Sequence, residues 1–115
     1  MITDTQLRAR MTMERKVVRH LIRTAKAHGY QLKAVWDGGE RVKCDLESEA
    51  MDSVFSVDES TIYFKHPDEL EGHCAFIVLG NDGWDAIADN SQGGKWDEVM
   101  AKCDTYSDKL CEATV

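Results

Sequence analysis

The chain has 115 residues, 43% of them hydrophobic, and a formal net charge of −7 at pH 7. This length suffices for one hydrophobic core and is too short for two, so we expect a single domain over residues 1–115. The composition excludes a disordered chain. The longest uninterrupted apolar run, Cys74–Leu79, is far shorter than the roughly 20 residues that span a bilayer, so we expect no membrane-spanning segment.

Targeting and redox signals are scarce in this sequence. Residues 1–15 lack the apolar stretch of a secretory signal. The four cysteines show neither the spacing of a disulfide framework nor that of a zinc site. We therefore expect a cytoplasmic protein with reduced thiols and with no metal or cofactor.

The net charge is divided unevenly along the chain. Residues 1–28 carry seven Lys/Arg and two carboxylates, about +5, whereas residues 29–115 carry seven Lys/Arg and nineteen carboxylates, about −12. Such asymmetry bears on the choice of partners rather than on the fold.

The first expected element is an N-terminal helix that ends near His28. Thr3 and Gln6 have the spacing of a capping box, and Gly29 is a natural stop. Apolar residues recur on one face of this helix: Leu7, Met11, Val18, Leu21, Ile22 and Ala25.

A β-hairpin is expected next, because the apolar period changes from that of a helix to two. The alternating residues before the turn at Asp37-Gly38-Gly39 are Tyr30, Leu32, Ala34 and Trp36, and those after it are Val42, Cys44 and Leu46. Residues 47–56 are consistent with one short helix or a wound crossover, and a strand is expected over Thr61–Lys65.

Three further elements complete the expected fold. The run Cys74–Leu79 is apolar on both faces, which predicts the central strand of the sheet. Trp84, Ile87 and Ala88 indicate a short helix, and the spacing from Trp96 to Leu110 predicts a C-terminal helix. The expected class is α+β: a four-stranded, mainly antiparallel sheet with an N-terminal helix and C-terminal helices packed against it.

No catalytic residue can be assigned, because the sequence lacks a nucleophile elbow, a phosphate-binding glycine motif and a short metal chelate. The carboxylates Asp82, Asp85 and Asp89 either converge on a cation or cap a helix and face water. Trp84 is the tryptophan we expect to be exposed, if one is. The candidates for protein or ligand binding are Asn81, Asp82, Trp84, Asp85 and Asp89.

The N-terminal helix also carries a basic ridge beside its apolar stripe. Its members are Arg8, Arg15, Arg19, Arg23 and Lys26. Such a ridge can follow the phosphates of a nucleic acid. The alternative is a solvated face, or one that pairs with carboxylates of the same chain or of a second subunit.

The run Val78–Asp89, VLGNDGWDAIAD, resembles part of a small domain of accessory proteins in phages, plasmids and other mobile elements. The resemblance extends over about residues 16–111. Supporting positions are Gly29-Tyr30, Val35 with Asp37-Gly38, Val57-Asp58-Glu59, Phe64 and Asp108 to Leu110. It implies a genetic setting and no activity, because the family has no assigned activity.

The leading functional hypothesis is a non-enzymatic accessory protein that binds another protein, either a host protein or a second copy in a homodimer. The acidic charge outside the first helix favours basic or nucleic-acid-handling partners, and an acidic inhibitor of such a host protein is one form. Direct nucleic-acid binding through the basic ridge is the first alternative. The second is a small-ligand or enzymatic site near the Gly80–Trp84 turn.

Overall fold

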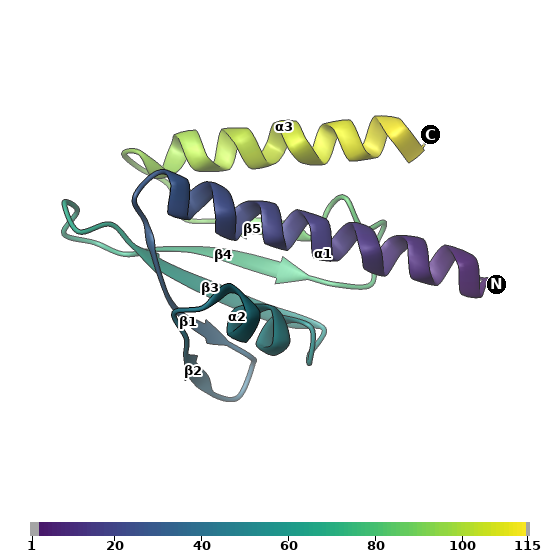
Figure 1. Cartoon of the computed structure of the whole chain (residues 1–115), viewed down its shortest axis with the longest axis horizontal. Helices are drawn as coiled ribbons and strands as arrows, with labels where there is room; N and C mark the ends of the chain where they lie inside the picture. Colours follow the sequence, from purple (N-terminus) through teal and green to yellow (C-terminus); the bar gives the residue numbers. More distant parts are fainter. Residues whose placement is uncertain (1–2, 115) are drawn as a thin grey trace.

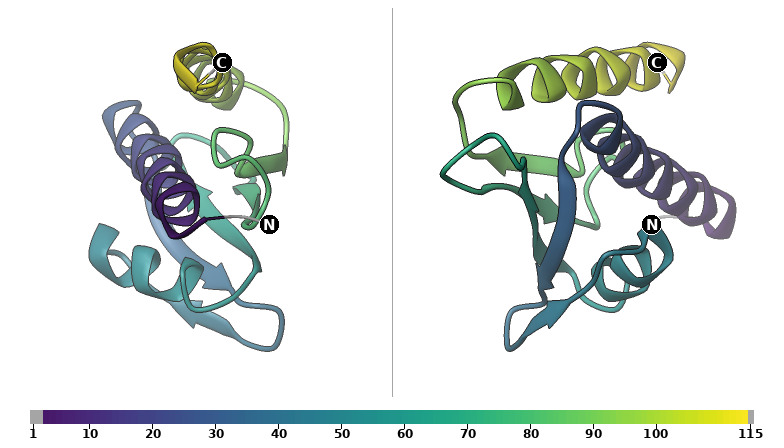
Figure 2. Two further views of the ribbon diagram at one scale, coloured as in Figure 1. Left: turned by 90° about the vertical axis from the view of Figure 1, so that its right-hand side faces the viewer. Right: turned by 60° about the vertical axis from the view of Figure 1, so that its left-hand side comes forward.

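The computed structural model describes residues 3–114 and places three helices on one face of a five-stranded sheet (Figure 1, Figure 2). The helices are α1 (Asp4–Ala27), α2 (Glu47–Val54) and α3 (Trp96–Thr114). The strands are β1 (Gln31–Trp36), β2 (Arg41–Lys43), β3 (Glu59–Lys65), β4 (His73–Val78) and β5 (Ile87–Asn90). The α+β class and the helices at both ends of the chain are thus confirmed.

Helix α1 forms as its caps predict, and the second half of the expected apolar stripe is buried, whereas Met11 in the first half is 42% exposed. The Gln6 backbone N–H donates to Thr3 Oγ1 at 3.1 Å, and the Thr3 N–H donates to Gln6 Oε1 at 2.8 Å, which completes the capping box. Gly29 follows the helix with φ of +89°, and a side chain there would collide with the ring of His66. The residues of α1 that are buried against the rest of the fold are Glu14, Val17, Val18, Leu21, Ile22 and Ala25.

The sheet is antiparallel throughout and has the strand order β2-β1-β3-β4-β5. Its five strands correct the expected four. The central strand is β3, so the expectation that Cys74–Leu79 forms the centre is wrong. On β4, Ala75 and Ile77 are fully buried, whereas Phe76 and its outward-facing neighbours are only half-buried. The apolar run is therefore covered by the helices on one face only.

The inner face of the sheet forms one side of the hydrophobic core. Directly paired residues of adjacent strands share a face, so the pairs Val35 with Ile62 and Ile62 with Ala75 all point toward the helices. Val35, Ile62 and Ala75 are completely buried, as is Trp96 at the start of α3. Trp96 lies against the ring of Tyr30, with the ring centroids 5.1 Å apart.

The short helix expected from Trp84 to Asp89 is also wrong, because this segment forms a turn and then β5. Gly80 and Gly83 both have positive φ, which a helix does not allow. The Asp85 side chain accepts the backbone N–H groups of Asp82 and Gly83 at 3.1 and 3.2 Å and so closes the turn. The backbone then pairs with β4, with Ile87 opposite Ile77.

Helix α3 confirms the expected C-terminal helix and packs along α1 (Figure 1). The rings of His20 and Tyr106 stack between the two helices with centroids 4.1 Å apart. Within residues 3–114, no helix is both long and apolar enough to cross a membrane.

Candidate functional site

The outer face of the sheet, which lies opposite the three helices, is the most distinctive surface of the described chain (Figure 2). The strand pairing places aromatic side chains from three adjacent strands on it: Trp36 of β1, Tyr63 of β3 and Phe76 of β4. Trp36 is 40% exposed, and the other two rings are half-buried. Large rings on an uncovered face are typical of a binding surface.

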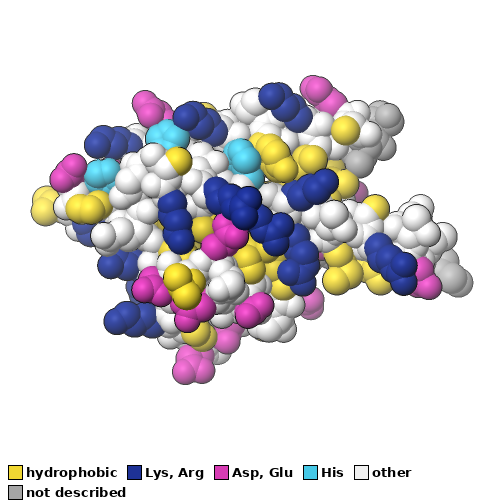
Figure 3. Space-filling view, in the orientation of Figure 1, with side chains coloured by type: hydrophobic (Ala, Val, Ile, Leu, Met, Phe, Trp, Pro, Cys, Tyr) yellow, Lys and Arg dark blue, Asp and Glu magenta, His cyan; other side chains and the backbone are white. Residues whose placement is uncertain are grey.

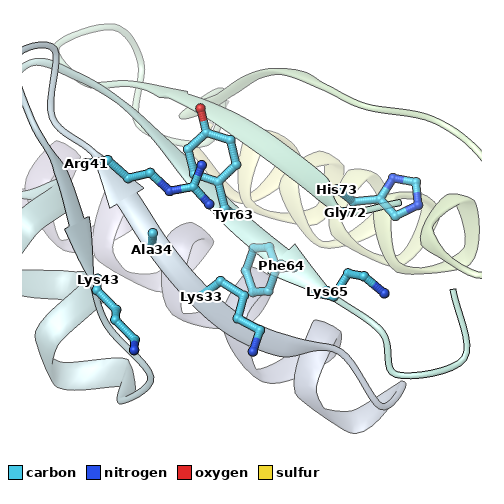
Figure 4. A pocket seen from close by; sticks show the side chains of 9 residues that line it. All are labelled: Lys33, Ala34, Arg41, Lys43, Tyr63, Phe64, Lys65, Gly72 and His73. Atoms are coloured by element: carbon cyan, nitrogen blue, oxygen red, sulfur yellow. The ribbon is translucent and has the colours of Figure 1, made fainter. Parts of the chain in front are cut away.

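A hollow of about 500 Å³ opens on this face at its β1–β2 corner (Figure 4). Ala34 lies within it and is small, so the guanidinium of Arg41 reaches across β1 from β2 and lies 4.4 Å from the centre of the Tyr63 ring. This cation–π contact holds Arg41 against the ring. The residues that line the hollow are Lys33, Ala34, Arg41, Lys43, Tyr63, Phe64, Lys65, Gly72 and His73.

The hollow is strongly cationic in a protein that is acidic overall. Lys33, Arg41, Lys43 and Lys65 line it, and no carboxylate of the described residues does. The Lys65 ammonium donates to the backbone carbonyls of His66 and Glu69, so its position is fixed by the following loop. Within the part of the chain that the structure describes, Lys33, Arg41 and Lys43 make no ion pair. We call these three residues the cation triad.

A β-bulge in β1 creates this arrangement. Leu32 pairs with Phe64 on the inner face, but the next pair is Ala34 with Tyr63, so Lys33 is the additional residue. Strict alternation from Leu32 would direct Ala34 and Trp36 into the core. The bulge instead turns both residues toward the outer face. The expectation from simple alternation, that they share a face with Leu32, is therefore wrong.

The basic ridge of α1 is largely occupied by contacts within the chain. Arg23 donates to both carboxylate oxygens of Glu47 on α2, at 2.8 and 3.2 Å, and Arg19 lies 3.8 Å from the same carboxylate. The hydrogen bond from Arg23 lowers the pKa of Glu47. Lys26 donates to the Asp45 carbonyl at 3.3 Å.

Two members of the ridge lie away from Glu47. Arg15 places its guanidinium 4.5 Å from the centre of the Phe55 ring, and Arg8 is exposed. Figure 3 shows the ridge as a band of Lys and Arg over α1, with acidic side chains beside it. The ridge is therefore a continuous basic surface in which several charges already have partners.

A groove between α1 and α3 lies beside the ridge. Two hollows of about 380 and 240 Å³ meet at the stacked rings of His20 and Tyr106. Lys16 and Lys102 border it from opposite helices. Burial lowers the pKa of His20, which favours its neutral form against Tyr106.

The residues singled out near the turn do not converge on one point. Asp85 caps the turn from within, Asn81 and Asp82 are exposed, and Asp89 lies on the outer sheet face in β5. Trp84 is half-buried, so the exposed tryptophan is Trp36 instead. Among residues 3–114, no group of three or more His, Cys, Asp or Glu side chains is arranged to hold a metal ion.

The turn instead has a structural contact with α1. The buried carboxylate of Glu14, 2% exposed, accepts the Gly80 N–H at 2.7 Å. A side chain at Gly83 would lie 3.0 Å from the Arg10 carbonyl oxygen, so glycine allows the turn to approach the helix closely. A hollow of about 210 Å³ remains beside Gly80, Arg10 and Glu14. The conspicuous sequence run at residues 78–89 thus holds the β4–β5 connection against α1.

Known proteins offer no guide to this chain: no family model matches it, and no curated protein or solved structure shows significant similarity. The resemblance to accessory proteins of mobile elements therefore stays a prediction. The function of this chain must therefore be inferred from its surface.

Proposed function

We propose that this protein is a non-enzymatic binding module that holds single-stranded nucleic acid on the outer face of its sheet. The observation that carries the proposal is the cation triad, which has no acidic partner among residues 3–114 and borders an aromatic hollow. Unpaired cations attract phosphates, and exposed rings stack on bases; single-strand binding proteins combine these two features.

The distribution of charge favours this face over α2 and α3, whereas α1 is basic, with seven Lys/Arg and two carboxylates. Helix α2 has three carboxylates and no Lys or Arg, and α3 has five carboxylates and two lysines. The five strands together have four Lys/Arg and two carboxylates, Glu59 and Asp89. A polyanion that approaches this acidic protein therefore meets positive potential at two places, the triad corner of the sheet and α1, where several of the charges already have partners.

The aromatic rings favour a single strand over a duplex. In a duplex the faces of the bases are stacked on one another, so a protein ring cannot reach them. Trp36, Tyr63 and Phe76 lie on three adjacent strands, so they offer a row of apolar surface on which unstacked bases can lie. The triad borders this row at β1 and β2, where a phosphate backbone can follow it.

The basic ridge is a weaker candidate for the same ligand. Binding of phosphates by Arg19 or Arg23 requires that they leave Glu47, whose carboxylate they already contact. The free energy of that exchange opposes binding, whereas the triad gives up only a cation–π contact of Arg41. The hypothesis of a protein partner remains a prediction, and a second copy of this chain is considered below.

The decisive experiment is a titration of a fluorescent oligonucleotide, followed by anisotropy over a range of salt concentrations. The test variant replaces Lys33, Arg41 and Lys43 with Gln. The matched control replaces three cations of α1, Lys16, Arg19 and Arg23, with Gln. For single strands each phosphate contact contributes about −0.7 to the slope of log K against log salt, so the test variant should reduce its magnitude by about 2.

The expected result is a loss of affinity in the sheet variant and near-native affinity in the α1 variant. Equal losses in both variants would show non-specific attraction, and a loss in the α1 variant alone would move the site to the ridge. Either outcome overturns the proposal. A duplex of the same length serves as competitor, and it should bind more weakly than the single strand.

A further inference from the structure

One row of directly paired residues crosses the whole outer face of the sheet. It passes from Arg41 on β2 to Trp36 on β1, Thr61 on β3, Phe76 on β4 and Asp89 on β5. All five side chains point to the outer face, because directly paired residues of adjacent strands share a side. The row therefore has a cation at one sheet edge, an anion at the other, and an aromatic residue on each side of a central threonine.

This order is complementary to itself. Two such faces can meet about a two-fold axis that lies between them and runs parallel to β3. Rotation about this axis exchanges the two edges of the sheet, so β2 of one copy faces β5 of the other. Thr61 then lies on its own counterpart, and Trp36 lies over Phe76 of the second copy. The Arg41 position lies over Asp89 of the second copy, and the guanidinium must leave the Tyr63 ring to pair with it. A two-fold interface requires this property, because the same patch must serve both copies.

We propose that the protein associates with a second copy of itself through this face. The two sheets would pack face to face in the aligned manner of a β-sandwich. The aromatic pairs would bury apolar surface, and the Arg41–Asp89 contact would fix the register between the copies. The dimer does not depend on the proposed nucleic-acid binding.

The size of the face sets the strength of this dimer. The strands are three to seven residues long, and at about 3.3 Å per residue and about 4.8 Å between strands they cover on the order of 400 Å² per copy, about half of a standard interface. Glu59 also faces outward on β3 near the proposed axis, where it would approach its own counterpart. Both features predict a weak dimer that forms only as the concentration rises.

A regulatory consequence follows if the proposed function also holds. The dimer would cover the hollow and the rings, so a second copy and a single strand would compete for the same face. Oligonucleotide should then dissociate the dimer.

The test is sedimentation velocity over a concentration series with charge-swapped variants. Asp89→Arg and Arg41→Asp alone each place like charges together at both ends of the row, so association should weaken at least about tenfold. An equimolar mixture of the two variants restores opposite charges at both ends and should form a heterodimer. The double variant R41D/D89R should also regain self-association, which excludes misfolding as the cause of the loss.

Several outcomes would overturn the inference. They are a native chain that stays monomeric throughout the series, a dimer that is unaffected by the single variants, and a mixture that fails to associate. A Glu59→Gln variant gives an independent check, because removal of the like charge near the axis should strengthen the native dimer.

Oligonucleotide binding by Asp89→Arg separates the two proposals. This variant gains positive charge on the outer face, so it should bind a single strand at least as tightly as the native chain while losing self-association. If the charge-swapped variants change self-association as expected but the native chain binds no oligonucleotide, the dimer is supported and the proposed function is overturned. If the native chain binds oligonucleotide but never self-associates, the proposed function is supported and the dimer is overturned.

Discussion

The cations of α1 and the cations of the outer sheet face differ in what they touch. On α1, Arg19 and Arg23 converge on Glu47, and Lys26 is bound to a backbone carbonyl. On the sheet, Arg41 lies on the ring of Tyr63, and no ion pair involves the triad within residues 3–114. Helix α1 thus has more positive charge than the sheet face, but more of its cations already have partners within the chain.

This difference shows why a count of charges along the sequence locates a binding surface poorly. A cation that is already paired must break an internal contact before it binds a ligand, and its net contribution is small. A cation without a partner gives up only its hydration. Partner availability, which depends on the tertiary structure, therefore decides between the two surfaces.

The largest expected effect comes from removing the rings of the outer face. Trp36→Ala combined with Tyr63→Ala should weaken oligonucleotide binding by about 100-fold, because each base–aromatic stack contributes about 1–3 kcal/mol. The measurement is the anisotropy titration at fixed salt. Tyr106→Ala, which removes a ring from the α1–α3 groove, is the matched control and should leave the affinity within about twofold. A larger loss in the control would place the binding site on the helical side.

Filling the hollow should have a smaller effect. Ala34→Leu introduces a branched side chain beneath Arg41 and should displace the guanidinium from the Tyr63 ring. We expect about a tenfold loss of affinity with all three triad charges retained, because the stacking surface is blocked. Ala9→Leu on the exposed side of α1 is the control. Unchanged binding by Ala34→Leu would mean that the ligand avoids the hollow.

The sequence predicted the elements whose signals are local. Thr3 and Gln6 define the start of α1, and the stripe that begins at Trp96 defines α3, because both depend on spacing within one helix. The expected helix after Gly83 failed because three apolar residues are too short a pattern to fix an element, and the pairing of β5 with β4 overrode their helical spacing.

The candidate site could not be predicted in the same way. The bulge at Lys33 leaves no clear mark in the sequence, yet it reverses the faces of Ala34 and Trp36. Only the pairing with β3 brings Tyr63 beside Arg41, and these residues are 22 positions apart in the chain. The alternation of Arg41 and Lys43 on a short edge strand was the one available signal, and it indicates a cationic outer face.

Protection of Cys74 should show the ligand on the outer face directly. Cys74 pairs with Tyr63 there and is half-buried, whereas burial raises the pKa of the Cys103 thiol to about 12 and keeps it protonated at pH 8. Bound oligonucleotide should slow alkylation of Cys74 several-fold and leave the rate at Cys111 on α3 unchanged. Peptide mass spectrometry after timed alkylation measures both rates in one sample. Equal slowing at the two thiols would indicate a general change of the fold.

The smallest expected effect concerns the paired side of the molecule. Contact with Arg23 lowers the pKa of Glu47 from its ordinary value of 4.5, so the folded state favours the ionised carboxylate. The resulting stability is complete above about pH 5 and is lost as the pH falls through the lowered pKa. Glu47→Gln should therefore lower the urea midpoint by about 0.2–0.4 M at pH 7, and the difference from the native chain should shrink as the pH falls through the lowered pKa.

Unfolding curves at several pH values measure this difference. Asp52→Asn is the control, because Asp52 lies exposed on the same helix and makes no ion pair within residues 3–114. The Glu47 variant also frees Arg19 and Arg23. If pairing is what keeps these cations from binding phosphates, the variant should gain oligonucleotide affinity through α1, and this gain should disappear when Arg19 and Arg23 are replaced as well. An unchanged affinity would mean that the ridge is excluded by its geometry rather than by its acidic partner.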